Sequence, residues 1–250
     1  MEIYEGQVVI VAGGGAGIGA AAATLLASRG AMVVVSDVVL ANAEKVAAEI
    51  TGSGGKAVAR ELNVADQSGV SNFINSVAKE FGRLDAIVNS AGIVGPTNTP
   101  IEKITASDIE KVLSINLLGA IWLTQAALPI MKAAKYGRIV HVASIAGKEG
   151  NPGMTPYVLS KSALIGFVKA VAKEVATEGI TINSIAPAVI KTPMNANTSE
   201  ETLKYMISRI PMGRLGEAEE VAEMISFAAS KACSFTTGFC FDTSGGRATY

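Results

Sequence analysis

A tyrosine and a lysine in the sequence have types and a spacing that suit proton transfer. Tyr157 and Lys161 are four positions apart, so on a helix both side chains lie on one face. A nearby cation favours the phenolate and is expected to lower the pKa of a tyrosine from about 10 toward neutrality. Such a phenol can exchange a proton with a substrate hydroxyl. The pattern is short, so its meaning depends on the elements that position it.

Ser144 ends an apolar run, Ile139–Ala143, that predicts a buried strand. Ligands of open parallel sheets bind beyond the carboxyl ends of strands, so we expect Ser144 at such an edge. The same run contains His141, the one histidine of the chain. Because it lies inside the strand, we interpret His141 as a packed or hydrogen-bonded side chain rather than a general base.

A glycine cluster follows the first apolar run of the chain. Val8–Ala12 leads directly into Gly13, Gly15, Gly17 and Gly19, and an alanine-rich helical segment comes next. Glycines allow the tight turn there and let the backbone approach a pyrophosphate at the helix N-terminus. This strand–glycine–helix order predicts a dinucleotide site.

Asp37 ends the second apolar run, twenty residues after Gly17. In nucleotide folds an acidic side chain there accepts hydrogen bonds from the adenosine ribose. A carboxylate would repel a 2′-phosphate, and positions 16, 36 and 38 carry no arginine or lysine. We therefore expect NAD(H) rather than NADP(H); the alternative is an aspartate that only ends a strand.

Short apolar runs alternate with longer segments of helical period along the whole chain. The predicted strands are Val8–Ala12, Met32–Ser36, Ala57–Glu61, Ala86–Asn89, Arg138–Ala143, Thr181–Ala186 and Phe239–Phe241. The predicted helices are Gly17–Arg29, Asn42–Gly52, Gln67–Phe81, Ser107–Lys132, Tyr157–Thr177 and Glu217–Ala229. Continuous apolar strands alternating with helices indicate a parallel sheet covered on both faces. We predict a single α/β domain over residues 1–250, with a doubly wound parallel seven-stranded sheet.

Composition argues against several other classes of protein. The net charge is −1 with no basic run, which argues against a nucleic-acid partner. One histidine and two cysteines, Cys233 and Cys240, offer neither a zinc site nor a disulfide framework, so we expect no metal and a cytoplasmic location. The N-terminus has no secretory signal. The most apolar window, Leu117–Met131, is too short to span a bilayer, so no membrane is expected.

These motifs together resemble the short-chain dehydrogenase/reductase family in its compact form, a Rossmann fold, over the whole chain. The family landmarks occur in order as Gly13-x-x-x-Gly17-x-Gly19, Asn63-Val64, Asn89-Ser90-Ala91-Gly92, Asn116-Leu-Leu-Gly119, Ser144, Tyr157-x-x-x-Lys161, Pro187 to Met194, and Asp242 before Gly245-Gly246. The resemblance implies a nicotinamide-dependent oxidoreductase.

The resemblance also implies roles for four catalytic residues. Tyr157 would be the general base in alcohol oxidation, and Lys161 would hold the nicotinamide ribose and lower the pKa of Tyr157. Ser144 would hydrogen-bond the substrate oxygen, and Asn116 would anchor a water that links Lys161 to solvent.

For the cofactor, the resemblance implies a contact set drawn from the ends of several strands. Its members are Gly13, Gly15, Gly17, Ile18, Gly19, Asp37, Asn63, Val64, Asn89, Ala91, Gly92, Tyr157, Lys161, Pro187, Ile190 and Thr192. Four positions depart from the usual family pattern without removing a catalytic group, namely Ala12, Asn63, Ser90 and Ala188.

Residues expected near the substrate are less specific. They are Ser144, Ala146, Asn151, Met154, Tyr157, Met194 and Arg247, with a lid near residues 193–212. Lys148, Asn151 and Arg247 could recognise hydroxyls or a carboxylate, which favours a polyol, a sugar or a deoxy-sugar acid. Arg247 stands in a C-terminal tail that, in related tetramers, reaches a neighbouring subunit.

Three hypotheses remain for the function. The first is NAD-dependent oxidation of a secondary alcohol; the second is reduction of 3-oxoacyl chains or other ketones, for which family members commonly prefer NADPH. The third is a catalytically idle NAD-binding sensor, against which the intact catalytic set argues. The helix Tyr157–Thr177 is apolar almost all round, as is the segment 112–131, so we expect a homotetramer or homodimer.

Overall fold

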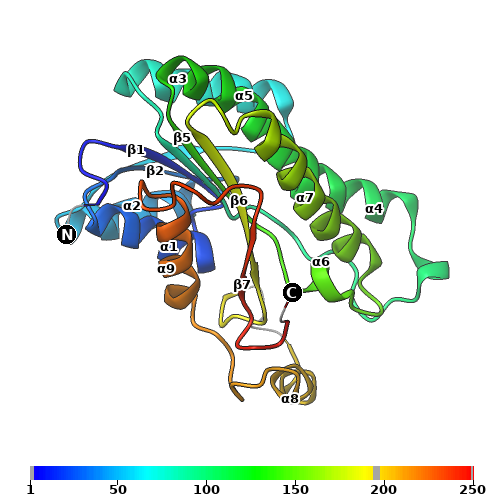
Figure 1. Ribbon diagram of the computed structural model, residues 1–250. Helices are drawn as coiled ribbons and strands as arrows, with labels where there is room; N and C mark the ends of the chain where they lie inside the picture. Colours follow the sequence, from blue (N-terminus) through cyan, green and yellow to red (C-terminus); the bar gives the residue numbers. More distant parts are fainter. Residues whose placement is uncertain (1–2, 194–197, 249) are drawn as a thin grey trace.

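The computed structural model describes residues 3–193, 198–248 and 250, and it confirms the predicted fold class. A single sheet has the strand order β3-β2-β1-β4-β5-β6-β7, and every pair is parallel (Figure 1). The strands are β1 (Val8–Ala12), β2 (Met32–Asp37), β3 (Lys56–Glu61), β4 (Ala86–Asn89), β5 (Gly137–Val142), β6 (Ile180–Pro187) and β7 (Cys240–Thr243). The order reverses between β1 and β4, the point where such sheets bind nucleotides.

Helices cover both faces of the sheet. The elements on the two faces and at the sheet edge are α1 (Gly17–Ser28), α2 (Leu40–Gly52), α3 (Gln67–Phe81), α4 (Ala106–Leu113), α5 (Gly119–Ala134), α7 (Thr155–Glu174) and α9 (Ala218–Ala228). Helices α1, α2 and α9 lie on one face, and α3, α5 and α7 on the other (Figure 1). Each face encloses its own core.

Alternation along the strands fills both cores. In β1, Val9 and Val11 join the cluster under α1 and α9, whereas Val8, Ile10 and Ala12 join the cluster under α3, α5 and α7. Successive strand side chains point to opposite faces, so a strand buried on both sides must be apolar at every position. This explains why the strands were readable as unbroken apolar runs.

The prediction of one regular α-helix over Ser107–Lys132 is wrong. Between α4 and α5 the chain forms a π-helical turn, η2 (Ser114–Leu118). Such turns are rare and occur frequently at functional sites. Three further short elements were not predicted: η1 (Ile101–Lys103), α6 (Ala146–Glu149) and α8 (Glu200–Ser208).

Residues Ala106–Ala134 form a helical run of 29 residues that contains an 18-residue window with mean hydropathy 1.5, long and apolar enough to cross a membrane by length and composition alone. This is longer than the apolar window considered from the sequence. Within the fold the run flanks the sheet, and Leu123, Ala127 and Met131 of its inner face are completely buried in the core. A core helix of a sheet protein meets the same length criterion.

Candidate active site

The carboxyl ends of four neighbouring strands bring the predicted site residues to one edge of the sheet. Gly13 follows β1, Asn89 ends β4, Ser144 follows β5 and Pro187 ends β6. Ligands of parallel sheets bind at this edge.

Helix α7 adds the predicted acid–base pair to this edge. Pro156 stands in its first turn, where a missing N–H is tolerated, and Tyr157 follows directly. The Ser144 hydroxyl lies near enough to the Tyr157 phenol to lower its pKa. The Lys161 ammonium lies 5.8 Å from the centre of the Tyr157 ring and donates to the Val142 carbonyl oxygen at 2.7 Å. The structure thus brings together the three residues that the sequence singled out.

The ionisation of Tyr157 differs from the expectation. Desolvation of the phenol raises the pKa of Tyr157 above its ordinary 10.0, and the neighbouring Ser144 hydroxyl lowers it only in part. Burial disfavours the charged form of a tyrosine. The net shift is therefore upward, opposite to the shift expected from the spacing of Tyr157 and Lys161.

Lys161 is itself deeply buried. Desolvation lowers its pKa from 10.5 to about 8, so the ammonium form still predominates at neutral pH. Gly147 packs against the helix beside it, since an added Cβ there would lie 2.7 Å from the Lys161 carbonyl carbon. The turn after Ser144 therefore packs directly against α7.

Asn116 lies in the π-helical turn and faces the same site. Its Nδ2 donates to the Ile93 carbonyl oxygen at 2.9 Å and to Ser160 Oγ at 3.0 Å, and its Oδ1 accepts from the Ile93 N–H at 2.8 Å. A Cβ added to Gly92 would lie 3.2 Å from Asn116 Oδ1 and 3.5 Å from Lys161 Nζ. Asn116, Gly92 and Lys161 are therefore neighbours, as the resemblance implies.

The glycine turn is shaped by close packing. A Cβ on Gly13 would lie 2.6 Å from the Ala91 backbone nitrogen, and one on Gly19 would lie 2.0 Å from the Gly13 carbonyl oxygen. Gly17 has φ +53°, a conformation that favours glycine. These contacts bring the end of β4, the turn and the start of α1 together.

The N-terminus of α1 is open to an anion. Its N-cap residue, Ala16, offers no side-chain oxygen, and its first turn, which includes Ile18, holds no acidic residue. The backbone N–H groups and the helix dipole at such an end favour a phosphate. The turn therefore fits the pyrophosphate of a dinucleotide.

Asp37 lies beside this turn at the end of β2. Its Oδ2 accepts from the Gly15 N–H at 3.1 Å, and its Oδ1 accepts from the Val39 N–H at 3.0 Å. A carboxylate can accept about four hydrogen bonds, so both oxygens keep capacity for ribose hydroxyls. The residue has the position and the chemistry that a dinucleotide ribose requires.

The remaining cofactor candidates line the same edge. Asn63 Oδ1 accepts from the Ala65 N–H at 3.0 Å, and Asn89 Oδ1 accepts from the Ala91 N–H at 3.2 Å, so each amide fixes its own turn. Val64 packs on Gly119, where an added Cβ would lie 2.8 Å from its Cγ2. After Pro187, the loop through Ile190 reaches Thr192, whose Cγ2 lies 3.1 Å from a Cβ placed on Gly17.

His141 is a packed, hydrogen-bonded side chain, as predicted. It is fully buried, its Nδ1 lies 3.3 Å from Asn89 Nδ2, and its Nε2 lies 3.0 Å from Thr124 Oγ1. The Thr124 hydroxyl donates to the Ala120 carbonyl oxygen at 2.8 Å, so it accepts from an Nε2–H tautomer of His141. Desolvation, reinforced by the charge of Lys161, lowers the pKa of His141 from 6.5 to about 3.

We expect His141 to make folding sensitive to acid. Its pKa is about 3 when folded and 6.5 ordinarily, so the unfolded chain binds the extra proton and stability falls as the pH drops below 6.5. Between pH 7 and pH 5 this one group should remove about 2 kcal/mol from the free energy of unfolding. Urea unfolding at both pH values should show a smaller loss for His141→Asn than for the unmodified protein. Equal losses would contradict the assignment.

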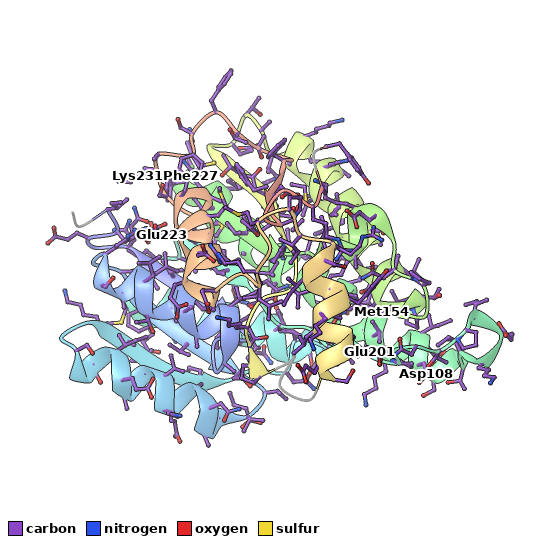
Figure 2. The ribbon with its side chains drawn as sticks, turned by 90° about the horizontal axis from the view of Figure 1, so that it is seen from below. Asp108, Met154, Glu201, Glu223, Phe227 and Lys231 are labelled. Carbon is purple, nitrogen blue, oxygen red and sulfur yellow. The ribbon has the colours of Figure 1, made fainter. Side chains whose placement is uncertain are left out.

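The residues expected near the substrate gather around α6. The Ala146 N–H donates to Ser144 Oγ at 3.1 Å, and Asn151 Nδ2 lies 3.9 Å from Met154 Sδ. Met154 and Glu201 of α8 lie at the same end of the molecule (Figure 2). Met194 lies outside the described residues.

The two cations expected to face the substrate are instead paired within the chain. Arg247 Nε donates to Glu149 Oε2 at 2.8 Å, and Lys148 Nζ donates to Asp242 Oδ2 at 3.3 Å. Both cationic side chains are less than one tenth exposed. No sequence signal identifies these partners, because about a hundred positions separate the members of each pair. Among the described residues, no group of three or more His, Cys, Asp or Glu side chains is placed to hold a metal.

Comparisons with known proteins match nearly the whole chain. A family model described as enoyl-(acyl carrier protein) reductase matches residues 12–247. The chain is 39% identical over 247 residues to the 2-dehydro-3-deoxy-L-rhamnonate dehydrogenase (NAD(+)) of Sphingomonas sp., covering 99% of this chain and 97% of the relative. It is 38% identical to the 3-oxoacyl-[acyl-carrier-protein] reductase of Thermotoga maritima, covering 97% and 98%.

A solved structure shows the same fold. The crystal structure of gox2181 superposes with a TM-score of 0.95 at 32% sequence identity, covering 98% of this chain and 97% of that one. The family model and the curated relatives span nearly the whole chain, and the motifs lie together in space as described above. The chain therefore belongs to the short-chain dehydrogenase/reductase family.

Proposed function

We propose that the protein is an NAD(H)-dependent oxidoreductase that moves a hydride between nicotinamide and a secondary alcohol carbon. The observation that carries this proposal is the placement of Ser144, Tyr157 and buried Lys161 together at the sheet edge next to the glycine turn. A hydroxyl that meets both side chains can lose its proton to one while the other stabilises its oxygen.

In the direction of oxidation, Ser144 holds the substrate oxygen and Tyr157, as phenolate, takes the hydroxyl proton. The electron pair that the proton leaves on oxygen forms the carbon–oxygen double bond, and the hydrogen leaves the carbon with its own electron pair as hydride; a bound nicotinamide would supply the acceptor. Lys161 places a positive charge near the phenolate and would offer N–H groups to the ribose of that cofactor. In reduction Tyr157 returns the proton, and its raised pKa keeps it protonated for that task at neutral pH.

For the cofactor, we propose NAD(H) over NADP(H). Asp37 lies beside Gly15 with a carboxylate that can accept from ribose hydroxyls and would repel a 2′-phosphate. The name of the Sphingomonas relative specifies NAD(+), which supports the same choice.

For the substrate, we propose a polyol, a sugar or a deoxy-sugar acid, with the last favoured. The Sphingomonas relative is named for a deoxy-sugar acid and matches along nearly its whole length. A second candidate is reduction of a 3-oxoacyl chain, favoured by the similarity to the Thermotoga maritima reductase. The carboxylate of Asp37 argues against an NADPH-dependent version of that reaction.

A substrate panel tests the proposal. Secondary alcohols, polyols, sugars and sugar acids are each incubated with NAD or NADP, and the reduced nicotinamide is read by absorbance. We expect turnover with NAD on a hydroxylated acid or polyol. If no substrate of the panel is oxidised and NADPH reduces a 3-oxoacyl substrate, the assignment as an NAD-dependent alcohol dehydrogenase is wrong.

Further proposals concern the substrate lid and the assembly. Residues 193–212 would act as a lid; within them α8 buries none of its side chains. We propose a cytoplasmic homotetramer or homodimer, supported by the exposed apolar side chains Leu118 and Leu159, next to α5 and on α7. Sedimentation analysis would measure the assembly.

A further inference from the structure

The last residues of the chain fold back onto α6, the turn that follows the catalytic serine. Figure 1 shows the C-terminus beside α6. We use the name C-terminal clasp for Asp242, Arg247 and Tyr250 together with their partners Lys148 and Glu149 on α6.

Arg247 makes the central contacts of the C-terminal clasp. Its Nε donates to Glu149 Oε2 at 2.8 Å, and its Nη2 donates to Asn151 Oδ1 at 3.2 Å. The side chains of Arg247 and Glu149 are only 8% and 18% exposed. The rigid guanidinium fork fixes two acceptors in one plane, so the contact specifies a geometry that a lysine could not reproduce.

Lys148 and Tyr250 complete the C-terminal clasp. Lys148 Nζ donates to Asp242 Oδ2 at 3.3 Å and lies 5.0 Å from the centre of the Tyr250 ring. The Tyr250 hydroxyl donates to the Lys148 carbonyl oxygen at 2.5 Å. Both α6 residues are therefore held by the tail.

The turn formed by α6, which the tail contacts, also contacts two of the proposed catalytic residues. Ser144 Oγ accepts from the Ala146 N–H at 3.1 Å, and Gly147 packs against the backbone of Lys161. On its other side the tail contacts the segment after α8, where the Met212 N–H donates to the Gly245 carbonyl oxygen at 3.1 Å. The tail therefore lies between the proposed lid and the turn that presents Ser144.

Charge balance decides how the C-terminal clasp can act. Glu149 neutralises Arg247, and Asp242 neutralises Lys148. Buried ion pairs of this kind specify a conformation, whereas breaking one partner leaves an uncompensated charge. Two neutral pairs add no net attraction for a substrate anion. The arrangement suits positioning of the turn better than direct capture of a carboxylate.

We propose that Arg247 is a positioning residue that, through Glu149 and Asn151, fixes the turn after Ser144 and thereby sets the affinity for the alcohol or ketone substrate. The proposal rests on the proposed function, because it takes Ser144 as the residue that meets the substrate oxygen. The glycine turn and Asp37 belong to β1, α1 and β2 and share none of these contacts among the described residues. The described contacts of the C-terminal clasp therefore do not reach the residues proposed to bind the pyrophosphate and the adenosine ribose, so we expect the affinity for NADH to be unchanged when the clasp is broken.

The test compares Arg247→Ala and the milder Arg247→Lys with the unmodified protein on two substrates, a neutral polyol and a sugar acid. We expect the KM of both substrates to rise about tenfold in Arg247→Ala, within the range that misplacement of a reacting group produces. The Kd of NADH, measured by fluorescence, should stay the same. Arg60→Gln, which breaks an exposed ion pair with Glu80 at β3, is the matched control and should leave all constants unchanged.

Each other outcome overturns the proposal. A rise in KM for the acid alone would make Arg247 a ligand of the substrate carboxylate, and unchanged KM values would leave it no role. Hydrogen exchange of residues 145–151 gives a readout that needs no turnover: it should speed up in both Arg247 variants but not in Arg60→Gln. If the unmodified protein oxidises no substrate, the proposed function fails, and unchanged exchange in the Arg247 variants would then separately refute the positioning role.

Discussion

Tyr157→Phe is expected to lower kcat by roughly 10²- to 10⁴-fold, the contribution of a positioned acid or base, while leaving NADH binding intact. The substitution removes only the phenol oxygen, the atom proposed to exchange the proton with the substrate. The ring can stay in place on α7, and Lys161 keeps its partner, the Val142 carbonyl oxygen. Steady-state kinetics in both directions, with NADH fluorescence for binding, would measure the two effects separately.

A second tyrosine provides the control for this experiment. Tyr136 directly precedes β5, at the amino ends of the strands and thus at the opposite edge of the sheet from Ser144. Tyr136→Phe deletes the same atom from a similarly buried ring and should keep normal turnover. Near-normal turnover in Tyr157→Phe would remove Tyr157 from the role of general base.

The pH dependence should follow the same assignment. Oxidation needs the phenolate and reduction needs the phenol, and desolvation raises the pKa of Tyr157. We therefore expect the rate of oxidation to rise toward alkaline pH, with reduction already efficient at neutral pH. A rate of oxidation that falls between pH 7 and pH 9 would contradict this.

The fold could be predicted from the sequence because local and long-range signals agree. A strand such as β1 is buried on both faces, so each of its residues is apolar, and the glycines after it mark the turn into α1. The proximity of Ser144, Tyr157 and Lys161 was also predictable, since Ser144 follows β5 and the other two lie in the first two turns of α7. Motif resemblance supplied Asn116, whose place in a π-helical turn leaves no periodic signature.

What sequence reasoning missed depends on contacts between distant residues. Arg247 and Glu149 are 98 positions apart, so their pairing emerges only when β7 and α6 meet. The pKa of Tyr157 was misjudged for a related reason. Sequence spacing showed its neighbouring cation, but the desolvation that dominates comes from the whole packed site.

Asp37→Ala is expected to lower the preference for NAD over NADP by about 10- to 100-fold, the equivalent of roughly 1.5 to 3 kcal/mol for hydrogen bonds to a charged group. Asp37 accepts hydrogen bonds from the N–H groups of Gly15 and Val39. Its remaining lone pairs are available to accept from ribose hydroxyls. Removing the carboxylate should raise the KM for NAD, because the ribose loses its acceptor. It should lower the KM for NADP, because the repulsion of a 2′-phosphate disappears.

Asp37→Asn separates the charge from the hydrogen bonds at the same position. The amide keeps an oxygen for the Gly15 N–H but carries no charge, so the KM for NADP should fall while NAD is bound better than by Asp37→Ala. Glu223 on α9, which accepts from Arg29 Nη2 at 2.8 Å just beyond the C-terminal end of α1, provides the distant control through Glu223→Gln. If the ratio of kcat/KM for NAD and NADP is the same in both Asp37 variants as in the unmodified protein, the carboxylate does not select the cofactor. The backbone of the glycine turn could not replace it in that role, because this backbone would contact the pyrophosphate that both cofactors share. A change of equal size in both variants would assign discrimination to the charge, whereas a larger change in Asp37→Ala would add the lost hydrogen bonds to it.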